Sequence, residues 1–158
     1  AFTTPCGSYT GFLGQAPLGT LNTAEVDEFL SQPRTAQLVT MYPTGTPHVA
    51  PVWFLWDNGR ALVMAGRSTV KIRNIRGNPS VSLCVPTADR PYSFVTVEGT
   101  ASITDRGLED MVRRTCVLYD GDERGAEFAA ELLAEDRLIL IVISPVRFIS
   151  WKEDEENG

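Results

Sequence analysis

The chain has 158 residues, of which 43% are hydrophobic and 22% charged, and these values are typical of a single globular domain. No run approaches the roughly 20 apolar residues of a membrane helix, and the first residues lack a secretory signal, so we expect a cytoplasmic protein without a membrane partner. The formal net charge of −6 argues against a nucleic-acid partner, because neutralising phosphates requires a basic face.

The first regular element is expected after an N-terminal stretch, residues 1–21, whose Gly, Thr and Pro show no periodicity and predict a flexible arm. A short helix follows, because Asn22 or Thr23 can cap it and Glu25 stands where a capping box places its carboxylate. Pro33 marks its end. Its buried face is expected to carry Val26, Phe29 and Leu30.

The rest of the chain is dominated by short β-rich runs separated by turn residues. The turns PTGTP and DNG join consecutive runs, and the second is a strong hairpin signal because Asn and Gly tolerate positive φ. The predicted strands are 35–41, 47–56, 60–66, 80–85, 92–104, 137–143 and 146–151, with helices at roughly 106–119 and 124–134. Six or seven short, mostly antiparallel strands with a few flanking helices predict a mainly β protein built on a small barrel.

The most informative segment is AGRSTVKIRNIRGNP, residues 65–79, within a window that holds no Asp or Glu. Ser68 or Thr69 is expected to cap a two-turn helix that ends at Gly77. A helix start carries partial positive charge, so Arg67 and Lys71 stand there against the usual preference. Ammonium, hydroxyls and free amides at one helix start predict a phosphate-binding site. The alternative is a solvated basic helix.

The second informative segment is PHVAPVWFLW, residues 47–56, which is apolar on both faces and predicts a buried strand. Pro51 cannot donate to a sheet ladder, so it predicts a bulge or a stretch of backbone that faces something other than a strand. A flat aromatic ligand against Pro51, Val52 and Trp53 would satisfy the second possibility. Trp53, Phe54 and Trp56 are equally compatible with ordinary core aromatics.

Other kinds of chemistry are disfavoured by the sequence. His48 is the only histidine, and the three cysteines show no CxxC spacing, so no metal site is predicted. Ser68 and Ser93 lack the G-x-S-x-G context of a hydrolase nucleophile, and no GxGxxG or Walker pattern occurs.

The order GTPHVAPVWF, hairpin, TVKIRNIRGNPSVSL and VEGTASI resembles the FMN-binding split barrels of the pyridoxamine 5'-phosphate oxidase group, especially their deazaflavin-dependent branch. The resemblance covers residues 22–151 and implies a split β-barrel and a homodimer with cofactor sites at the subunit interface. It divides the chain into the arm, a cofactor-binding domain at 22–152 and an acidic tail at 153–158. The implied cofactor-binding residues are His48, Ala50, Pro51, Val52, Trp53, Met64, Ala65, Arg67, Ser68, Thr69 and Lys71.

Three departures from the family pattern guide the choice of function. Pyridoxamine phosphate oxidases proper carry an Arg-Lys pair where this chain has Val70 and Lys71, and a basic residue near the position of Trp53. Their basic C-terminal substrate segment is replaced by SWKEDEENG. These differences disfavour oxidation of pyridoxine phosphate.

The resemblance therefore implies a reductase that transfers a hydride between coenzyme F-420, a deazaflavin, and a small organic substrate. The alternatives are an FMN-dependent enzyme like the pyridoxamine phosphate oxidases, or a non-catalytic flavin- or haem-binding protein. In such enzymes the cofactor carries the chemistry and the protein supplies position and electrostatics, so no catalytic acid or base is assigned.

Overall fold

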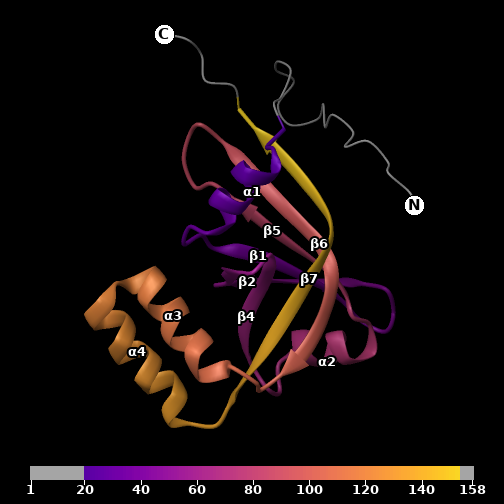
Figure 1. The fold of residues 1–158 in the computed structure, drawn as a ribbon. Helices are drawn as coiled ribbons and strands as arrows, with labels where there is room; N and C mark the ends of the chain where they lie inside the picture. The colour runs from indigo at the N-terminus through magenta and orange to yellow at the C-terminus, as the bar shows by residue number, and fades with distance from the viewer. Residues whose placement is uncertain (1–19, 154–158) are drawn as a thin grey trace.

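The computed structural model describes residues 20–153 (Figure 1). The predicted arm at residues 1–21 and the predicted acidic tail at 153–158 lie outside the described residues except at their inner ends. Within the described range no helix is both long and apolar enough to cross a bilayer.

Seven strands and four helices make up this part of the chain, which confirms a mainly β fold. The helices are α1 (Thr23–Leu30), α2 (Val70–Gly77), α3 (Leu108–Asp120) and α4 (Asp122–Ala134). The strands are β1 (Ala36–Met41), β2 (Pro47–Val52), β3 (Leu55–Asp57), β4 (Arg60–Gly66), β5 (Ser80–Pro86), β6 (Ser93–Thr104) and β7 (Leu138–Lys152).

The sheet is antiparallel throughout, with strand order β2-β1-β5-β6-β7-β4-β3. Its two edge strands, β2 and β3, are consecutive in the chain and are separated only by Trp53 and Phe54. A link this short reaches about 10 Å when fully extended, so the sheet must curl until its edges meet. The result is a split barrel, in agreement with the predicted class (Figure 1).

Two details of the strand predictions were wrong. Residues 47–56 form not one buried strand but the two edge strands, and Val49 on β2 is 56% exposed. Proline at an edge leaves no ladder hydrogen bond unmade, which explains how Pro51 is accommodated opposite Gln37. The two C-terminal runs are one continuous strand, β7, because Pro145 lies at a register shift between Glu98 and Gly99 of β6 rather than at a turn.

The predicted cap of α1 and the predicted DNG turn formed as the local chemistry requires. The Asn22 side chain accepts from the Glu25 backbone, and Glu25 accepts from the Asn22 backbone, at 2.9 and 3.2 Å. Val26, Phe29 and Leu30 are buried as expected. Asn58 and Gly59 have φ values of 49° and 71°, so the DNG turn closes the β3–β4 hairpin with the positive angles that those residues tolerate.

The VEGTA segment requires glycine at position 99 because the backbones of β6 and β7 approach closely there. At the β6–β7 register shift, a Cβ atom on Gly99 would collide with the Ser144 carbonyl oxygen. Only glycine allows β6 and β7 to approach this closely. The pairing of these long strands closes the barrel around a core that includes Leu38, Val63 and Ile141.

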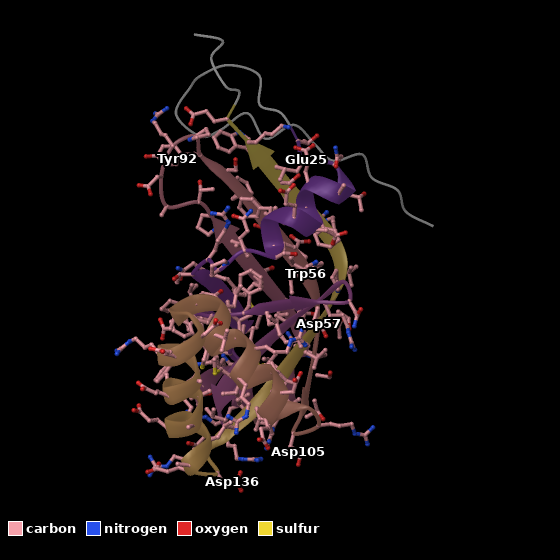
Figure 2. All side chains as sticks on the ribbon, turned by 60° about the vertical axis from the view of Figure 1, so that its left-hand side comes forward. Glu25, Trp56, Asp57, Tyr92, Asp105 and Asp136 are labelled. Atoms are coloured by element: carbon pink, nitrogen blue, oxygen red, sulfur yellow. The ribbon has the colours of Figure 1, made fainter. Side chains whose placement is uncertain are left out.

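Helices α3 and α4 form a hairpin beside β3 and β4, away from α1 and α2 (Figure 1). The hairpin is held to the barrel by an ion pair of 3.1 Å between Arg114 on α3 and Asp57 at the end of β3 (Figure 2). Met111, Val112 and Cys116 of α3 pack with Leu62 of β4 in a second apolar cluster. The hairpin is thereby fixed next to the point where β2 passes into β3.

Candidate cofactor-binding site

An open cleft of about 550 Å³ lies where the ends of β2 and β4 meet the start of α2 and the α3–α4 hairpin. Most of its surface is apolar. Its lining residues are Pro51, Val52, Trp53, Met64, Ala65, Gly66, Lys71, Asp120, Arg124, Phe128, Leu132 and Leu138.

Helix α2, which carries Lys71, is anchored to the barrel core. Ile72 and Ile75 of α2 are buried in the barrel core. The buried Asn74 amide donates to the Thr40 hydroxyl of β1 at 3.0 Å, so the polar group that α2 buries is satisfied. These contacts fix the orientation of the first turn of α2, and with it the position of Lys71 at the cleft.

The start of α2 leaves its amides available. Thr69 occupies the N-cap position, as predicted, but its side chain makes no capping hydrogen bond. Its hydroxyl donates instead to the Gly66 carbonyl at 2.8 Å, which stabilises the turn between β4 and α2. Because no side chain in the described part of the protein caps this helix, its first amides remain suited to an anion, which the partial positive charge of a helix start also favours.

Lys71 is a half-buried cation in the cleft wall. Within residues 20–153 no carboxylate forms an ion pair with its ammonium group. Partial burial lowers the pKa of Lys71 below its ordinary value, because removing the ammonium from water penalises the charged form. An anionic ligand would relieve this penalty.

The aromatic part of the cleft is built around Trp53. Its ring stacks on Tyr119 of α3 at a centroid distance of 4.5 Å and an interplanar angle of 16°. Phe128 of α4 meets it edge-on at 6.0 Å. The stacked Tyr119 ring and the edge of Phe128 therefore hold the indole from two directions.

The Tyr119 hydroxyl supplies hydrogen bonds where the sheet is interrupted. It donates to the Arg34 carbonyl at 2.6 Å and accepts from the Phe54 amide at 3.2 Å. Burial raises the pKa of Tyr119, although its backbone hydrogen bonds act in the opposite direction, so the hydroxyl loses its proton at a higher pH than that of an ordinary tyrosine. Tyr119 thus positions the crossover that presents Trp53.

Replacing Tyr119 with Phe should destabilise the protein while keeping the stacked ring. The Phe54 amide and the Arg34 carbonyl would lose their partner, which costs about 1–3 kcal/mol for a buried polar group left unsatisfied. Urea unfolding followed by tryptophan fluorescence measures this loss. Tyr92→Phe, which removes the hydroxyl of an exposed tyrosine, is the matched control and should leave the midpoint unchanged. Equal midpoints for Tyr119→Phe and the parent protein would rule out the bridging role.

Of the residues predicted for the site, the structure brings Pro51, Val52, Trp53, Met64, Ala65 and Lys71 together at the cleft. The others lie outside its lining. Arg67 pairs with Asp136 at 3.1 Å near the end of α4 (Figure 2), and Ser68 is exposed. His48 packs edge-on against Tyr42 at 5.6 Å, and Ala50 lies two residues further along β2. Of the two cations predicted for the site, Lys71 therefore lines the cleft and Arg67 does not.

The wall contributed by the α3–α4 hairpin was not predicted. Arg124, Phe128 and Leu132 recur every four residues and so share one face of α4, and Asp120 ends α3. One signal could have found Arg124: it stands in the first turn of a helix against the dipole preference, as Lys71 does. Within residues 20–153 no group of three or more His, Cys, Asp or Glu side chains is placed to hold a metal ion.

The curled antiparallel sheet, whose two edge strands are joined by only two residues, places the protein in the class of split β-barrels. An apolar cleft with a cation lies beside the split. The chain belongs to the pyridoxamine 5'-phosphate oxidase family, whose model matches residues 22–151. This match confirms the family resemblance found in the sequence.

Solved structures of several proteins share the fold. A conserved protein of Mycobacterium tuberculosis, Rv2991, is 22% identical over 87% of this chain and 92% of its own, with a TM-score of 0.70. An F420 reductase is 27% identical over 77% of this chain and 94% of its own, with a TM-score of 0.62. The haem storage protein HutZ of Vibrio cholerae is 21% identical over 82% and 94%, with a TM-score of 0.64. No curated protein matches the chain.

Proposed function

We propose that this protein is an oxidoreductase that transfers a hydride between a bound deazaflavin, coenzyme F-420, or FMN and a small organic substrate. The observation that carries the proposal is one cleft lined by both Lys71 and the Pro51–Trp53 segment. A half-buried ammonium that meets no carboxylate among the described residues suits a phosphate, and the apolar surface beside it suits a flat ring system. The likeness to an F420 reductase supports the deazaflavin as the first choice.

The cofactor, when bound, would supply the hydride chemistry, and the protein residues would bind and orient it. Lys71 and the first amides of α2 would hold the phosphate. Pro51, Val52 and Met64 would form the surface against which the rings lie, and Trp53 would limit their movement. Phe128 and Leu132 would exclude water from that side of the cleft.

The proposal includes a homodimer with the cofactor at the subunit interface. Several large apolar side chains are exposed in the single chain, and a second copy would cover them. They include Tyr42, Val49, Val146 and Phe148. Light scattering coupled to size-exclusion chromatography should give twice the monomer mass, and Val146→Asp should shift the mass toward the monomer. A monomeric parent protein would remove this part of the proposal.

Titration of the purified protein with F-420, FMN and haem, followed by turnover with whichever binds, tests the function. We expect saturable binding of F-420 or FMN and oxidation of the reduced cofactor by an added acceptor. The alternatives have distinct outcomes: binding of FMN with oxidation of a pyridoxamine-type substrate, or binding without turnover. Binding of neither flavin-type cofactor would refute the proposal.

A haem-binding role is the second candidate, and the likeness to HutZ is the observation that favours it. Haem commonly takes a histidine ligand. The only histidine of the chain, His48, lies outside the cleft lining, although its buried Nδ1 has no hydrogen-bond partner among the described residues. Haem bound at this cleft by histidine would therefore require His48 to move, and His48→Ala should remove the absorption bands that are characteristic of histidine-ligated haem.

The affinity for the phosphorylated cofactor should fall in the alkaline range. The ligand requires charged Lys71, whose pKa in the free protein is lowered by burial and would be raised by a bound phosphate. Affinity is therefore full below the free-protein pKa and declines as the pH rises from that value through the higher pKa of the complex. Lys71→Arg should move this decline in affinity above the measured pH range, since arginine stays charged. Dissociation constants measured from pH 7 upward provide the test, and an identical decline in Lys71→Arg would contradict it.

A further inference from the structure

The cleft has a second charged end, which the proposed cofactor phosphate does not use. Arg124, Phe128 and Leu132 lie along one face of α4, and the eight helical steps from Arg124 to Leu132 span about 12 Å. Helix α4 runs from the α3–α4 turn back toward the start of β7 (Figure 1). The cleft is therefore elongated, with Arg124 one helical turn before Phe128.

The two ends of the cleft can be assigned from the contacts of its walls. Leu138 pairs with Gly66 at the end of β4, directly before the turn into α2, so the Leu132–Leu138 end is the end of Lys71. Trp53 contacts Tyr119 and Phe128, so it lies toward the other end. Asp120 and Arg124 thus flank the aromatic end, where the far edge of a ring system anchored at Lys71 would lie.

Both charges at this end have the sign that the helix dipole disfavours at their positions. Asp120 is an acid in the last turn of α3, and Arg124 is a base in the first turn of α4. Both are exposed, and within residues 20–153 no ion pair joins them to each other or to another side chain. Local rules broken without a compensating contact tend to mark functional positions.

The chemistry of the pair specifies a particular kind of group. An ionised aspartate only accepts hydrogen bonds, and an arginine only donates them. The opposite charges balance, so the best partner is a neutral group with an N–H donor beside a carbonyl acceptor. Flavins and deazaflavins carry this arrangement in the imide edge of their ring, whereas haem does not.

We propose that Asp120 and Arg124 bind the imide edge of the cofactor ring, Asp120 accepting from its N–H and Arg124 donating to a neighbouring carbonyl oxygen. This inference rests on the proposed function, because it presumes a ring anchored through Lys71. It makes the α3–α4 hairpin a specificity element that distinguishes flavin-type rings from other flat anionic ligands.

The test compares FMN, N3-methyl-FMN and F-420 by titration against the parent protein and the Asp120→Ala and Arg124→Ala variants. Each variant should weaken binding of FMN and F-420 about tenfold, the usual effect of one hydrogen bond to a charged group. N3-methyl-FMN lacks the N–H, so it should bind the parent protein about tenfold more weakly than FMN. Asp120→Ala should remove this difference, whereas Arg124→Ala should retain it. Glu127→Ala and Arg106→Ala, exposed positions outside the cleft, are the controls.

The two proposals fail in different ways. If Lys71→Ala weakens binding but the Asp120 and Arg124 variants match the parent protein, the imide contact is wrong and the proposed cofactor site stands. Equal affinities of the parent protein for FMN and N3-methyl-FMN would also overturn the role of Asp120. If the parent protein binds neither FMN nor F-420, both proposals are refuted together.

Discussion

Lys71→Ala should weaken the binding of F-420 or FMN by about 1–3 kcal/mol, which corresponds to roughly a tenfold to hundredfold increase in the dissociation constant. The ammonium group lines the cleft, is partly removed from water and has no carboxylate partner within residues 20–153. A charge-assisted contact with phosphate is therefore made at little cost to existing interactions. Fluorescence or absorbance titration of the cofactor measures the effect directly.

The matched control is Arg76→Ala, which removes a cation from the last turn of the same helix without touching the cleft. It should leave the dissociation constant close to that of the parent protein, while Lys71→Arg should retain most of the affinity. If Lys71→Ala and Arg76→Ala have equal effects, a general attraction of the basic helix would explain the binding, and the specific phosphate contact would be wrong.

Gly125→Ala should destabilise the protein and weaken the cofactor site at the same time. Helices α3 and α4 approach so closely that an added Cβ would lie 2.5 Å from the Cys116 carbonyl oxygen and 2.6 Å from the Val117 Cα. These are backbone atoms that cannot rotate away, so the hairpin must separate at a cost of about 1–3 kcal/mol. This outweighs the roughly 1 kcal/mol by which alanine is ordinarily favoured over glycine within a helix.

Gly77→Ala is the corresponding control, since a Cβ there has no atom within 4 Å. Urea unfolding should show a lower midpoint for Gly125→Ala only, and titration should show weaker cofactor binding because Arg124, Phe128 and Leu132 move with α4. A Gly125→Ala protein as stable as Gly77→Ala would contradict the close packing of the hairpin.

Local sequence patterns were sufficient to predict the parts of the fold that depend on near neighbours. The capping box at Asn22, the DNG hairpin and the helix around Ile72 each follow from residues within a few positions of one another. The apolar run around Pro51 lines the cleft, but its assignment to one buried strand was wrong. Alternation cannot reveal which strand will lie at an edge, because that depends on pairing across the whole sheet.

The rest of the site depends on contacts between residues far apart in the chain. Arg67 was expected beside Lys71, but it pairs with Asp136, which lies 69 positions later. The local sequence around either residue does not predict this pairing. Likewise, the spacing of Phe128 and Leu132 is that of any amphipathic helix. Their place in the cleft wall follows from the α3–α4 hairpin docking near Trp53, which no local pattern specifies.

A crystal structure of the protein with F-420 or FMN would test the central claim most directly. We predict a phosphate oxygen within hydrogen-bonding distance of the Lys71 ammonium and the ring system against Pro51, Val52 and Trp53. A cofactor bound elsewhere on the molecule, with Lys71 directed into solvent and the cleft filled only by water, would contradict it.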